Sequence, residues 1–466
     1  MNLDELHYLE LRDVARLVHS RELSPVELTE AMLGRIEAVD PQLHAYVLVM
    51  AEDALNSARL AEAEIARGKV RGRLHGVPIA IKDIFWTRNA PTAAGMAIHH
   101  DVVAEDDATV VRRLREGGAA LLGKLTLTKG VYAEHRAPFP APINPWNPDY
   151  WPGASSSGSG VAVAAGMCFA ALASETGGSI KLPAAANGVT GLKPTWGRVS
   201  RYGVFELAAT LDHVGVMARS ASDAAAVLSV IAGADEKDPS ASAVPVPDYL
   251  AALEHGVMGM RIGVDPAWST DSVDGSTAGA LEGALATLRD LGAEIRSARL
   301  PDGEAMIWDW FGVCAAQTAL AHEATYPSRA AEYGPALADL LELGRKMSAL
   351  ELQRLLHRRD AFRQALDKVF DQVDLIALPV LSFPAPTMAR MTRVDDELIA
   401  GLHRFTCPFN MSGHPGIVMT CGFTTQGMPI AFQLVGRHFA EDTLLAAGYA
   451  FQRATDWHRV HPVTKR

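Results

Sequence analysis

The first part of the chain shows apolar residues at helical spacing. Four of them recur every three or four positions: Leu28, Met32, Ile36 and Val39. This periodicity predicts an amphipathic helix, and the preceding Ser24-Pro25-Val26-Glu27 is typical of a capping box with proline at the first helical position. The pattern predicts that this helix ends at Asp40-Pro41 and that a second helix spans about residues 51–67.

Residues 71–219 alternate short apolar strands with helices, separated by glycine clusters, as is typical of βα units. Residues 74–83 predict a turn and a short buried strand with Lys82 at its end. Farther on, the apolar run 161–173 separates two serine-glycine clusters and is long enough for a helix and a return strand. We therefore expect the second cluster to fold back beside the first, so that serines from both share one pocket.

Past residue 220 the pattern predicts helices, a loop and a strand. The expected elements are a helix at 221–233, a surface loop at 235–247, a strand at 260–264 and helices at about 278–291 and 349–370. Trp308 and Trp310 lie in an alanine-rich segment, where tryptophans at helical spacing are more often part of a core than of a substrate pocket.

The composition, 48% hydrophobic and 21% charged over 466 residues, is that of an ordinary folded protein. A net charge of −11 disfavours nucleic acid and anionic membranes as partners. The apolar stretch 160–173 is shorter than the about 20 residues that a bilayer helix needs, and residues 1–8 lack the regions of a signal peptide. The cysteines have no C-x-x-C spacing, which predicts buried free thiols in the cytoplasm and no metal site. They are Cys168, Cys314, Cys407 and Cys421.

Ser179 is the candidate nucleophile. Thr176, Gly177 and Gly178 precede it, and this run can present successive backbone N–H groups, including that of Ser179, to one point as an oxyanion hole. One such donor stabilises a tetrahedral intermediate by about 3 kcal/mol. The alternative is a glycine turn that binds phosphate.

Lys82 is the candidate base, because a serine hydroxyl needs a partner that takes its proton. A free lysine titrates near pH 10.4, so a neutral lysine requires burial that lowers its pKa by about 3 units, at about 4 kcal/mol. The apolar run 77–81 fits this demand, and Asp83 should point to the opposite face of the strand. The alternative is a solvated surface lysine.

The strand that ends at Lys82, the cluster Ser155-Ser156-Ser157-Gly158-Ser159-Gly160 and the run Glu175-Thr176-Gly177-Gly178-Ser179 resemble, in order and spacing, the motifs of the amidase signature family of serine hydrolases. Most of the chain shares the resemblance, which is weakest at 235–400. It extends to residues 24–47, 107–124, 191–200 and 427–437.

The resemblance implies catalytic roles. Ser179 would be the nucleophile, and Ser155, preceded by a cis peptide at Ala154-Ser155, would relay its proton to Lys82 without any cofactor. The resemblance places Glu175 and Lys181 around the nucleophile, and we interpret them as an ion pair that supports the loop together with Ser156. Ser155 and Ser156 as helix caps are the alternative.

The resemblance also implies one α/β/α sandwich with a mixed, mostly parallel central sheet flanked by helices. The whole chain, 1–466, would form a single domain. Its parts would be a helical clasp (1–70), a catalytic core (71–220), a variable substrate-shaping region (221–400) and a C-terminal strand and helix that return to the core (401–466).

A Ser-His-Asp site is a competing interpretation, since the chain has several candidate histidines. They are His75, His99, His100, His135 and His213. Asp212-His213 is the most tempting pair, but Ser179 lacks the G-x-S-x-G elbow, and residues 211–215 resemble a structural turn of the family.

The expected function is hydrolysis of linear amides, chiefly uncharged aryl or hydrophobic ones, with carbamates and esters as related substrates. The first alternative is the glutaminase subunit of a tRNA-dependent amidotransferase. The second is a binding protein for nucleotide or phosphate, although no dinucleotide fingerprint or P-loop occurs. A small molecule is the expected partner, and a homodimer is compatible with the resemblance.

Overall fold

A single sheet of 11 strands runs through the computed structural model, which describes residues 6–463. The strand order is β1-β3-β2-β4-β6-β5-β10-β11-β9-β7-β8. The strands are β1 (Tyr46–Val49), β2 (Pro78–Lys82), β3 (Ala120–Leu125), β4 (Ala170–Glu175), β5 (Thr190–Lys193), β6 (His213–Ala218), β7 (Arg261–Val264), β8 (Glu294–Ser297), β9 (Leu375–Pro379), β10 (Gly416–Phe423) and β11 (Pro429–Gly436).

The sheet is mixed, as expected, but parallel pairs are not the majority. Four of the ten pairs within residues 6–463 are parallel: β2–β3, β2–β4, β7–β8 and β7–β9. The other six are antiparallel. Antiparallel pairs predominate because the β10–β11 hairpin and the antiparallel pair β5–β6 lie in the middle of the sheet, between two groups of parallel strands.

Helices flank this sheet. The first group is α2 (Leu11–His19), α3 (Pro25–Leu43), α4 (Ala51–Ala66), α5 (Thr109–Glu116), α6 (Ser157–Ala164), α7 (Lys181–Asn187), α8 (Ala221–Ile231) and α9 (Tyr249–Ala252). The second is α10 (Pro266–Ser269), α11 (Gly275–Asp290), α12 (Glu304–Ala321), α13 (Pro335–Lys346), α14 (Ala349–Val369), α15 (Met388–Met391), α16 (Asp396–His403), α17 (Cys407–Ser412) and α18 (Glu441–Ala454). Short 3₁₀ helices cover Ala97–His99, Lys129–Val131, Leu253–His255, Ala330–Glu332 and Trp457–Arg459.

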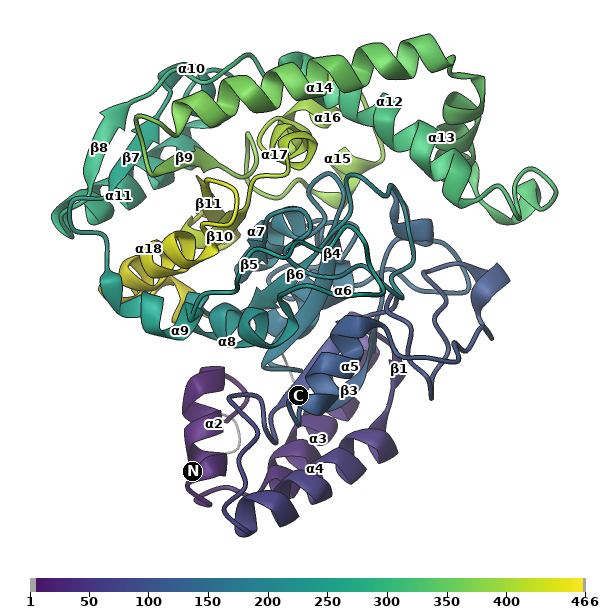
Figure 1. Ribbon diagram of the computed structural model, residues 1–466, viewed down its shortest axis with the longest axis vertical. Helices are drawn as coiled ribbons and strands as arrows, with labels where there is room; N and C mark the ends of the chain where they lie inside the picture. The colour runs from purple at the N-terminus through teal and green to yellow at the C-terminus, as the bar shows by residue number, and fades with distance from the viewer. Residues whose placement is uncertain (1–5, 464–466) are drawn as a thin grey trace.

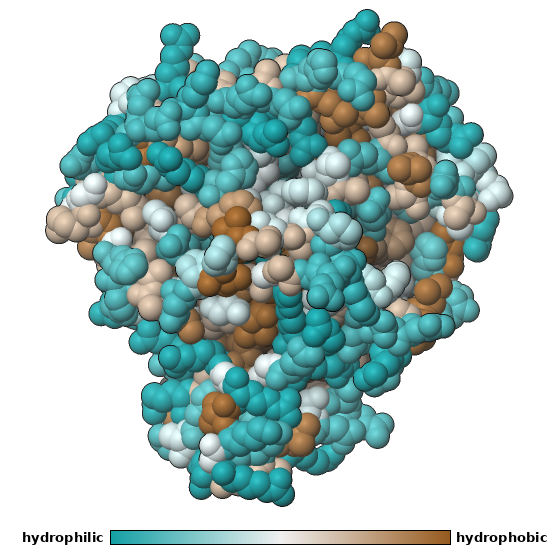
Figure 2. Space-filling view, in the orientation of Figure 1, coloured by the Kyte–Doolittle hydropathy of each residue, from teal (hydrophilic) through white to brown (hydrophobic). Residues whose placement is uncertain are grey.

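Two sets of helices form opposite ends of the molecule (Figure 1). Helices α2, α3 and α4 lie at one end, and α12, α13 and α14 lie at the other. Between them, α6 and α7 pack on each other, and α7 also packs on β5 and β10. Helices α8 and α18 form a second pair, with α8 on β6 and α18 on β10. Polar side chains cover most of the face in Figure 2, with apolar patches scattered among them.

The predicted N-terminal helix is present, but it does not end where expected. Ser24 caps α3 by accepting hydrogen bonds from the amides of Val26 (3.0 Å) and Glu27 (3.3 Å), while the reciprocal glutamate contact of a capping box is absent. The helix continues through Pro41 to Leu43. Pro41 removes one hydrogen bond and its ring crowds the carbonyl four residues earlier, but only two helical residues follow it, so little of the helix is affected.

The apolar run between the serine clusters behaves as predicted. It forms the end of α6 and most of β4, and the whole stretch 160–173 is buried, as a core segment should be. All four cysteines are free and buried. Within residues 6–463 none of the helices combines the length and apolar character needed to span a bilayer. Part of the expectation about residues 1–8 concerns residues 1–5, which lie outside the described residues.

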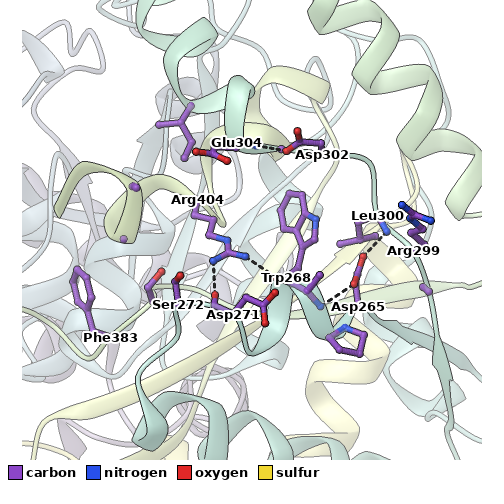
Figure 3. A pocket seen from close by; sticks show the side chains of 18 of the residues that line it. Asp265, Trp268, Asp271, Ser272, Arg299, Leu300, Asp302, Glu304, Phe383 and Arg404 are labelled. Atoms are coloured by element: carbon purple, nitrogen blue, oxygen red, sulfur yellow. Dashed lines mark hydrogen bonds between the residues drawn. The ribbon is translucent and has the colours of Figure 1, made fainter. Parts of the chain in front are cut away.

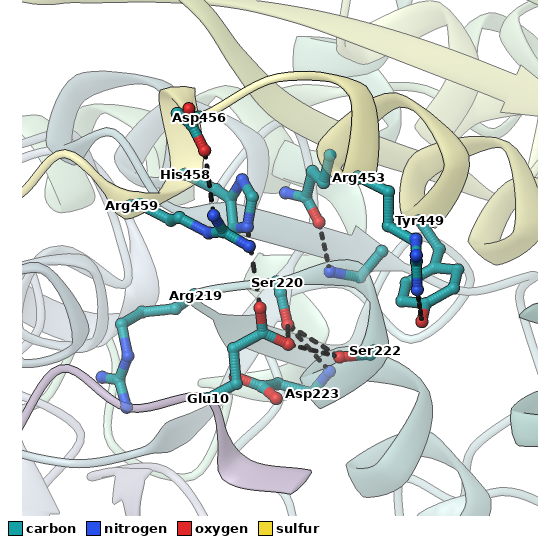
Figure 4. Close-up of polar contacts among 12 residues, drawn as sticks. Glu10, Arg219, Ser220, Ser222, Asp223, Tyr449, Arg453, Asp456, His458 and Arg459 are labelled. Carbon is teal, nitrogen blue, oxygen red and sulfur yellow. Dashed lines mark hydrogen bonds and ion pairs between the residues drawn. The ribbon is translucent and has the colours of Figure 1, made fainter. Parts of the chain in front are cut away.

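A buried polar network joins segments near the two ends of the chain (Figure 4). Glu10 accepts a hydrogen bond from Ser222 (3.0 Å) and lies 3.7 Å from the His458 ring nitrogen. Asp223 accepts a hydrogen bond from the Leu11 amide at 2.9 Å. Burial, together with the nearby Glu10 charge, raises the pKa of Asp223 to about 7. The network attaches α2 and the 457–459 turn to α8.

Candidate active site

The predicted base, Lys82, lies in the interior at the end of β2, next to the end of β4. The two strands are parallel neighbours, paired at Ala80 with Ala171 and at Ile81 with Leu172. Lys82 is the last residue of β2, and β4 runs on to Glu175 and then into the glycine loop. Ligand sites commonly form at such strand ends in α/β sheets.

Lys82 contacts two serine hydroxyls and is completely buried. Its Nζ lies 2.8 Å from Ser155 Oγ and 2.9 Å from Ser174 Oγ. Burial lowers the pKa of Lys82 to about 7, although the charges of Asp212 and Glu175 act in the opposite direction. The alternative of a solvated surface lysine is therefore wrong. The sequence reasoning overlooked Ser174, whose one signal was a hydroxyl residue in an otherwise apolar strand.

Asp83 points away from Lys82, as predicted. It pairs instead with Lys124 of β3 at 3.2 Å, on the other side of the strand. Lys124 Nζ also donates hydrogen bonds to Phe85 O and Thr92 Oγ1, each at 2.8 Å. Burial raises the pKa of Asp83 to about 6. The carboxylate next in sequence to the candidate base therefore has its own partner.

The first serine cluster adopts the expected backbone. The peptide bond between Ala154 and Ser155 is cis. Ser156 Oγ donates a hydrogen bond to Ser174 O at 3.1 Å, which ties the cluster to β4. No side chain caps the N-terminus of α6, so the alternative of Ser155 and Ser156 as helix caps is wrong.

The glycine loop is held by its carbonyl oxygens. Thr176 O accepts a hydrogen bond from Trp310 Nε1 at 2.8 Å, and Gly177 O accepts one from Thr406 Oγ1 at 2.6 Å. Within residues 6–463, no hydrogen bond from the backbone amides of 176–179 to another residue is present. These amides are the predicted oxyanion donors.

Glycine is required at two positions of this loop. A Cβ at Gly177 would lie 2.4 Å from the Trp310 ring, well inside contact distance. Gly178 has a φ of +144°, which side chains rarely adopt. A larger residue at either position would displace the backbone that leads into Ser179.

The predicted ion pair around Ser179 is present. Lys181 Nζ lies 3.3 Å from Glu175 Oε1, and both side chains are fully buried. Glu175 Oε2 also accepts hydrogen bonds from the amides of Ile180 (2.9 Å) and Lys181 (3.0 Å). The Glu175 carboxylate thus ties the residues that directly follow Ser179 back to the end of β4.

Ser179 is half-buried at the start of this turn. Its hydroxyl forms no hydrogen bond with any residue in the 6–463 range. The structure therefore joins Lys82 and Ser155 directly, while the Ser179 hydroxyl has no hydrogen-bond partner among the residues that the structure describes.

The histidines do not form a triad with Ser179 in the described part of the chain. His213 Nδ1 contacts its neighbour Leu211 O at 2.6 Å, as expected of a structural turn. His135 Nε2 does contact a serine, but it is Ser157, at 3.0 Å. Asp212 accepts hydrogen bonds from Thr176 Oγ1 (2.6 Å) and from the amides of Leu207 and Ala208, so it links the glycine loop to residues 207–208.

Aromatic side chains from distant segments lie against the loop. Trp310 is 4% exposed and stacks on His403 at 5.9 Å, and the His403 Nδ1 atom lies 3.4 Å from Gly177 O. Trp308, in contrast, is 44% exposed. The expectation of core tryptophans therefore holds for Trp310 and is wrong for Trp308. Their spacing of two residues places them on different sides of α12, and sequence alone gave no sign that His403 or Thr406 belongs to the site.

A cavity of about 960 Å³ opens beside α16 (Figure 3). Asp265 and Trp268 line one side of it, and Arg404 crosses it to donate a hydrogen bond to Ala267 O at 2.7 Å. Lys82, Ser155 and Ser179 are not among its lining residues. Ser174 instead borders a small cavity of about 20 Å³ that Asp212 and Glu206 also line.

Comparison with known proteins identifies relatives over nearly the whole chain. The family model described as Amidase matches residues 27–445. A Mycobacterium tuberculosis protein described as "Putative amidase AmiD" is 48% identical over 462 residues, which are 98% of this chain and 97% of that protein. A Glutamyl-tRNA(Gln) amidotransferase subunit of Moorella thermoacetica is 38% identical over 494 residues, 98% of this chain and 99% of that protein.

A solved structure gives the same result for the fold. A bacterial aryl acylamidase of the amidase signature family aligns with a TM-score of 0.86 at 26% identity, over 97% of each chain. The architecture and the family model therefore agree.

Proposed function

The chain belongs to the amidase signature family and is a hydrolase that acts on amides, and we propose that it works through an acyl-enzyme on Ser179. One observation carries this proposal: Lys82 is fully buried, has a pKa of about 7 and bonds to the Ser155 hydroxyl at 2.8 Å. A lysine with this pKa is substantially neutral near pH 7, so it can accept a proton.

In the proposed reaction Ser179 Oγ attacks the amide carbonyl carbon. The Ser179 proton passes to Ser155 Oγ, while the Ser155 proton passes to Lys82 Nζ. The reverse transfer protonates the leaving amine as the carbon–nitrogen bond breaks. Water then attacks the acyl-enzyme by the same proton route, which releases the acid and restores Ser179.

The backbone amides of 176–179 would stabilise the oxyanion. They have no protein acceptor within residues 6–463, and the carbonyl oxygens of Thr176 and Gly177 are held in place by other donors. Such preorganised donors contribute about 3 kcal/mol each to the tetrahedral intermediate. Fixing the carbonyls keeps the amides from rotating as charge develops.

We propose uncharged aryl or hydrophobic linear amides as substrates. His403, which is partly exposed, stacks on the buried Trp310 beside Gly177, so an aromatic ring lies next to the loop that holds the proposed nucleophile. The aryl acylamidase with the same fold supports this class. Carbamates and esters would form the same acyl-enzyme, because each has a carbonyl and a leaving group that can be protonated.

The test is amine release from aliphatic amides, anilides, aryl carbamates and esters by the parent, Ser179→Ala and Lys82→Ala. We expect activity in the parent, a loss of at least about 10³-fold in both variants, and a stoichiometric acyl adduct on Ser179 by mass spectrometry. Ser229→Ala, which changes an exposed serine on α8, is the matched control and should keep parental activity. Parental activity in Ser179→Ala, or an adduct on another residue, would contradict the proposal.

A glutaminase subunit is the second candidate, and the identity of 38% to an amidotransferase subunit favours it. That role requires a partner chain and a second active site. Hydrolysis of amides by the isolated chain without ATP or tRNA would support a stand-alone amidase. Glutamine as the only substrate, with ammonia release that depends on an added partner, would support the glutaminase role.

A further inference from the structure

Three potential metal ligands meet at a point remote in sequence from the catalytic motifs. Asp367 comes from the last turn of α14, His414 from the loop between α17 and β10, and His438 from the loop after β11. Asp367 Oδ1 lies 3.0 Å from His414 Nε2 and 3.5 Å from His438 Nδ1. All three ligand atoms lie within 4.8 Å of one another.

The spacing suits a tetrahedral ion. With zinc–ligand distances of about 2.0–2.1 Å, neighbouring ligands of a tetrahedral site lie about 3.4 Å apart. The two distances from Asp367 lie on either side of that value. Two imidazoles and one carboxylate are also a ligand set that zinc uses in proteins.

The hydrogen bonds outside the cluster indicate where the lone pairs point. His438 Nε2 lies 3.0 Å from Ser412 O, and a carbonyl oxygen can only accept, so Nε2 carries the proton. In the neutral ring Nδ1 then directs its lone pair at Asp367 Oδ1, which is also an acceptor. A cation between these two atoms would satisfy both.

The second histidine has a matching outer contact. His414 Nδ1 lies 3.0 Å from Ser412 Oγ, which leaves Nε2 toward Asp367. Histidines that bind metals usually bond through their other nitrogen to a carbonyl, carboxylate or water. Here one residue, Ser412, supplies the outer contact of both rings.

The rings themselves are held in place. The side chain of His414 is fully buried and stacks on Phe370 with a ring-centroid distance of 5.2 Å. The ring centroids of His414 and His438 lie 3.9 Å apart. The exposed fractions of His438 and Asp367 are 30% and 49%, so an ion can enter from solvent.

Two basic side chains lie nearby. Lys193 donates a hydrogen bond to His414 O at 2.6 Å. Arg363 pairs with Asp360 at 3.2 Å. Neither is hydrogen-bonded to a ligand atom of the cluster in the described structure.

We propose that Asp367 Oδ1, His414 Nε2 and His438 Nδ1 bind one divalent transition metal ion of the zinc class. The ion would join the end of α14 to the loops beside β10 and β11. Helix α17 lies between His414 and Thr406, and the Thr406 hydroxyl donates a hydrogen bond to Gly177 O of the glycine loop. The ion would therefore fix the segment that supports the proposed oxyanion donors.

The test uses the full-length protein after treatment with a chelator and removal of the chelator. Zn²⁺ binding is measured by calorimetry, and Co²⁺ binding by its visible absorption, for the parent, Asp367→Asn and His438→Ala. His357→Ala is the matched control, because it removes an exposed histidine from the same helix. Metal-free melting curves establish that each variant is folded.

We expect one ion per chain in the parent and in His357→Ala, with affinity at least tenfold weaker in Asp367→Asn and His438→Ala. Added Zn²⁺ should raise the melting temperature of the parent and the control only. The proposal is overturned if the parent shows no saturable binding, or if the folded ligand variants bind as tightly as the parent. These readouts do not depend on amide hydrolysis.

Discussion

Lys82 and Lys124 are both fully buried at the ends of adjacent strands, but they face different partners. Lys124 meets the carboxylate of Asp83 at 3.2 Å, whereas the hydrogen-bond partners of Lys82 within residues 6–463 are the hydroxyls of Ser155 and Ser174. Burial lowers the pKa of both lysines. The shift is opposed by the contacting Asp83 at Lys124, and at Lys82 by the charges of Asp212 and Glu175, to which Lys82 is not hydrogen-bonded in the described residues. The comparison shows that a buried lysine without a contacting carboxylate is available as a base, while a paired lysine is part of the scaffold.

Replacing each lysine by methionine gives the largest expected contrast. Lys82→Met should reduce kcat/KM by at least about 10³-fold and leave the free energy of unfolding at pH 7 unchanged or higher, because no buried carboxylate loses its partner. Lys124→Met should lower the free energy of unfolding by about 3–5 kcal/mol, since Asp83 stays buried and unpaired. Urea denaturation and activity per folded molecule measure the two effects. Equal losses of stability in Lys82→Met and Lys124→Met would contradict the distinction between an unpaired and a paired buried lysine.

Lys181 offers an intermediate case, because it is paired with Glu175 but lies two residues from Ser179, the proposed nucleophile. Lys181→Met should lower both kcat/KM and stability, since Glu175 would lose its partner while still bonding two loop amides. We expect a stability loss of about 3 kcal/mol and a fall in kcat/KM of about 10–100-fold. Lys181→Arg, which keeps the charge, should recover more activity than Lys181→Met. Full activity in Lys181→Met would show that the ion pair does not support the loop.

The pH dependence of Lys82 sharpens the same contrast. Its folded pKa of about 7 lies below the usual lysine value of about 10.4, so between these two pH values the unfolded chain binds more protons than the native chain. The Lys82 contribution therefore makes the protein more stable as pH rises from about 7 to 10, by up to about 1.4 kcal/mol per pH unit. Urea titrations from pH 7 to 9 should show a smaller rise in Lys82→Met than in the parent.

The pH dependence of kcat/KM should also follow the protonation of Lys82. kcat/KM should rise about tenfold per pH unit below pH 7 and level off above it, because only neutral Lys82 can accept the proton. A profile that is flat from pH 5 to 9 would contradict this role.

The smallest expected effect concerns the support of the glycine loop. Thr406→Val removes the hydrogen bond to Gly177 O while keeping the side-chain volume, so kcat should fall about tenfold with little change in KM. Thr392→Val, on an exposed turn after α15, is the control. An unchanged kcat would show that the Thr406 contact is dispensable.

Much of the local structure was predictable. The helix cap at Ser24, the strand that ends at Lys82 and the helix and strand between the serine clusters follow from short-range patterns that the structure confirms. The end of α3 was not predicted correctly, because a proline followed by only two helical residues disturbs little of the helix. The strand directions were also missed, since the pairing of β4, β5, β6 and β10 depends on contacts between distant segments.

Some residues of the candidate site were likewise predictable from the sequence, and others were not. Lys82, Ser155, Ser179 and the Glu175–Lys181 pair could be named because their motifs lie within about 100 residues of one another and resemble a family pattern. Trp310 and Thr406 could not be named from the sequence, because they contact the glycine loop from more than 130 residues away along the chain and belong to no local motif.

By itself the sequence determined which residues can do chemistry and which short segments are strands, helices or glycine turns, because periodicity and backbone preference act over a few residues. Tertiary structure decided that Lys82 faces hydroxyls and Lys124 faces a carboxylate. It also decided that Asp367, His414 and His438 meet. These environments arise only when distant strands and helices pack, and the low polarity of the packed interior is what lowers the pKa of Lys82.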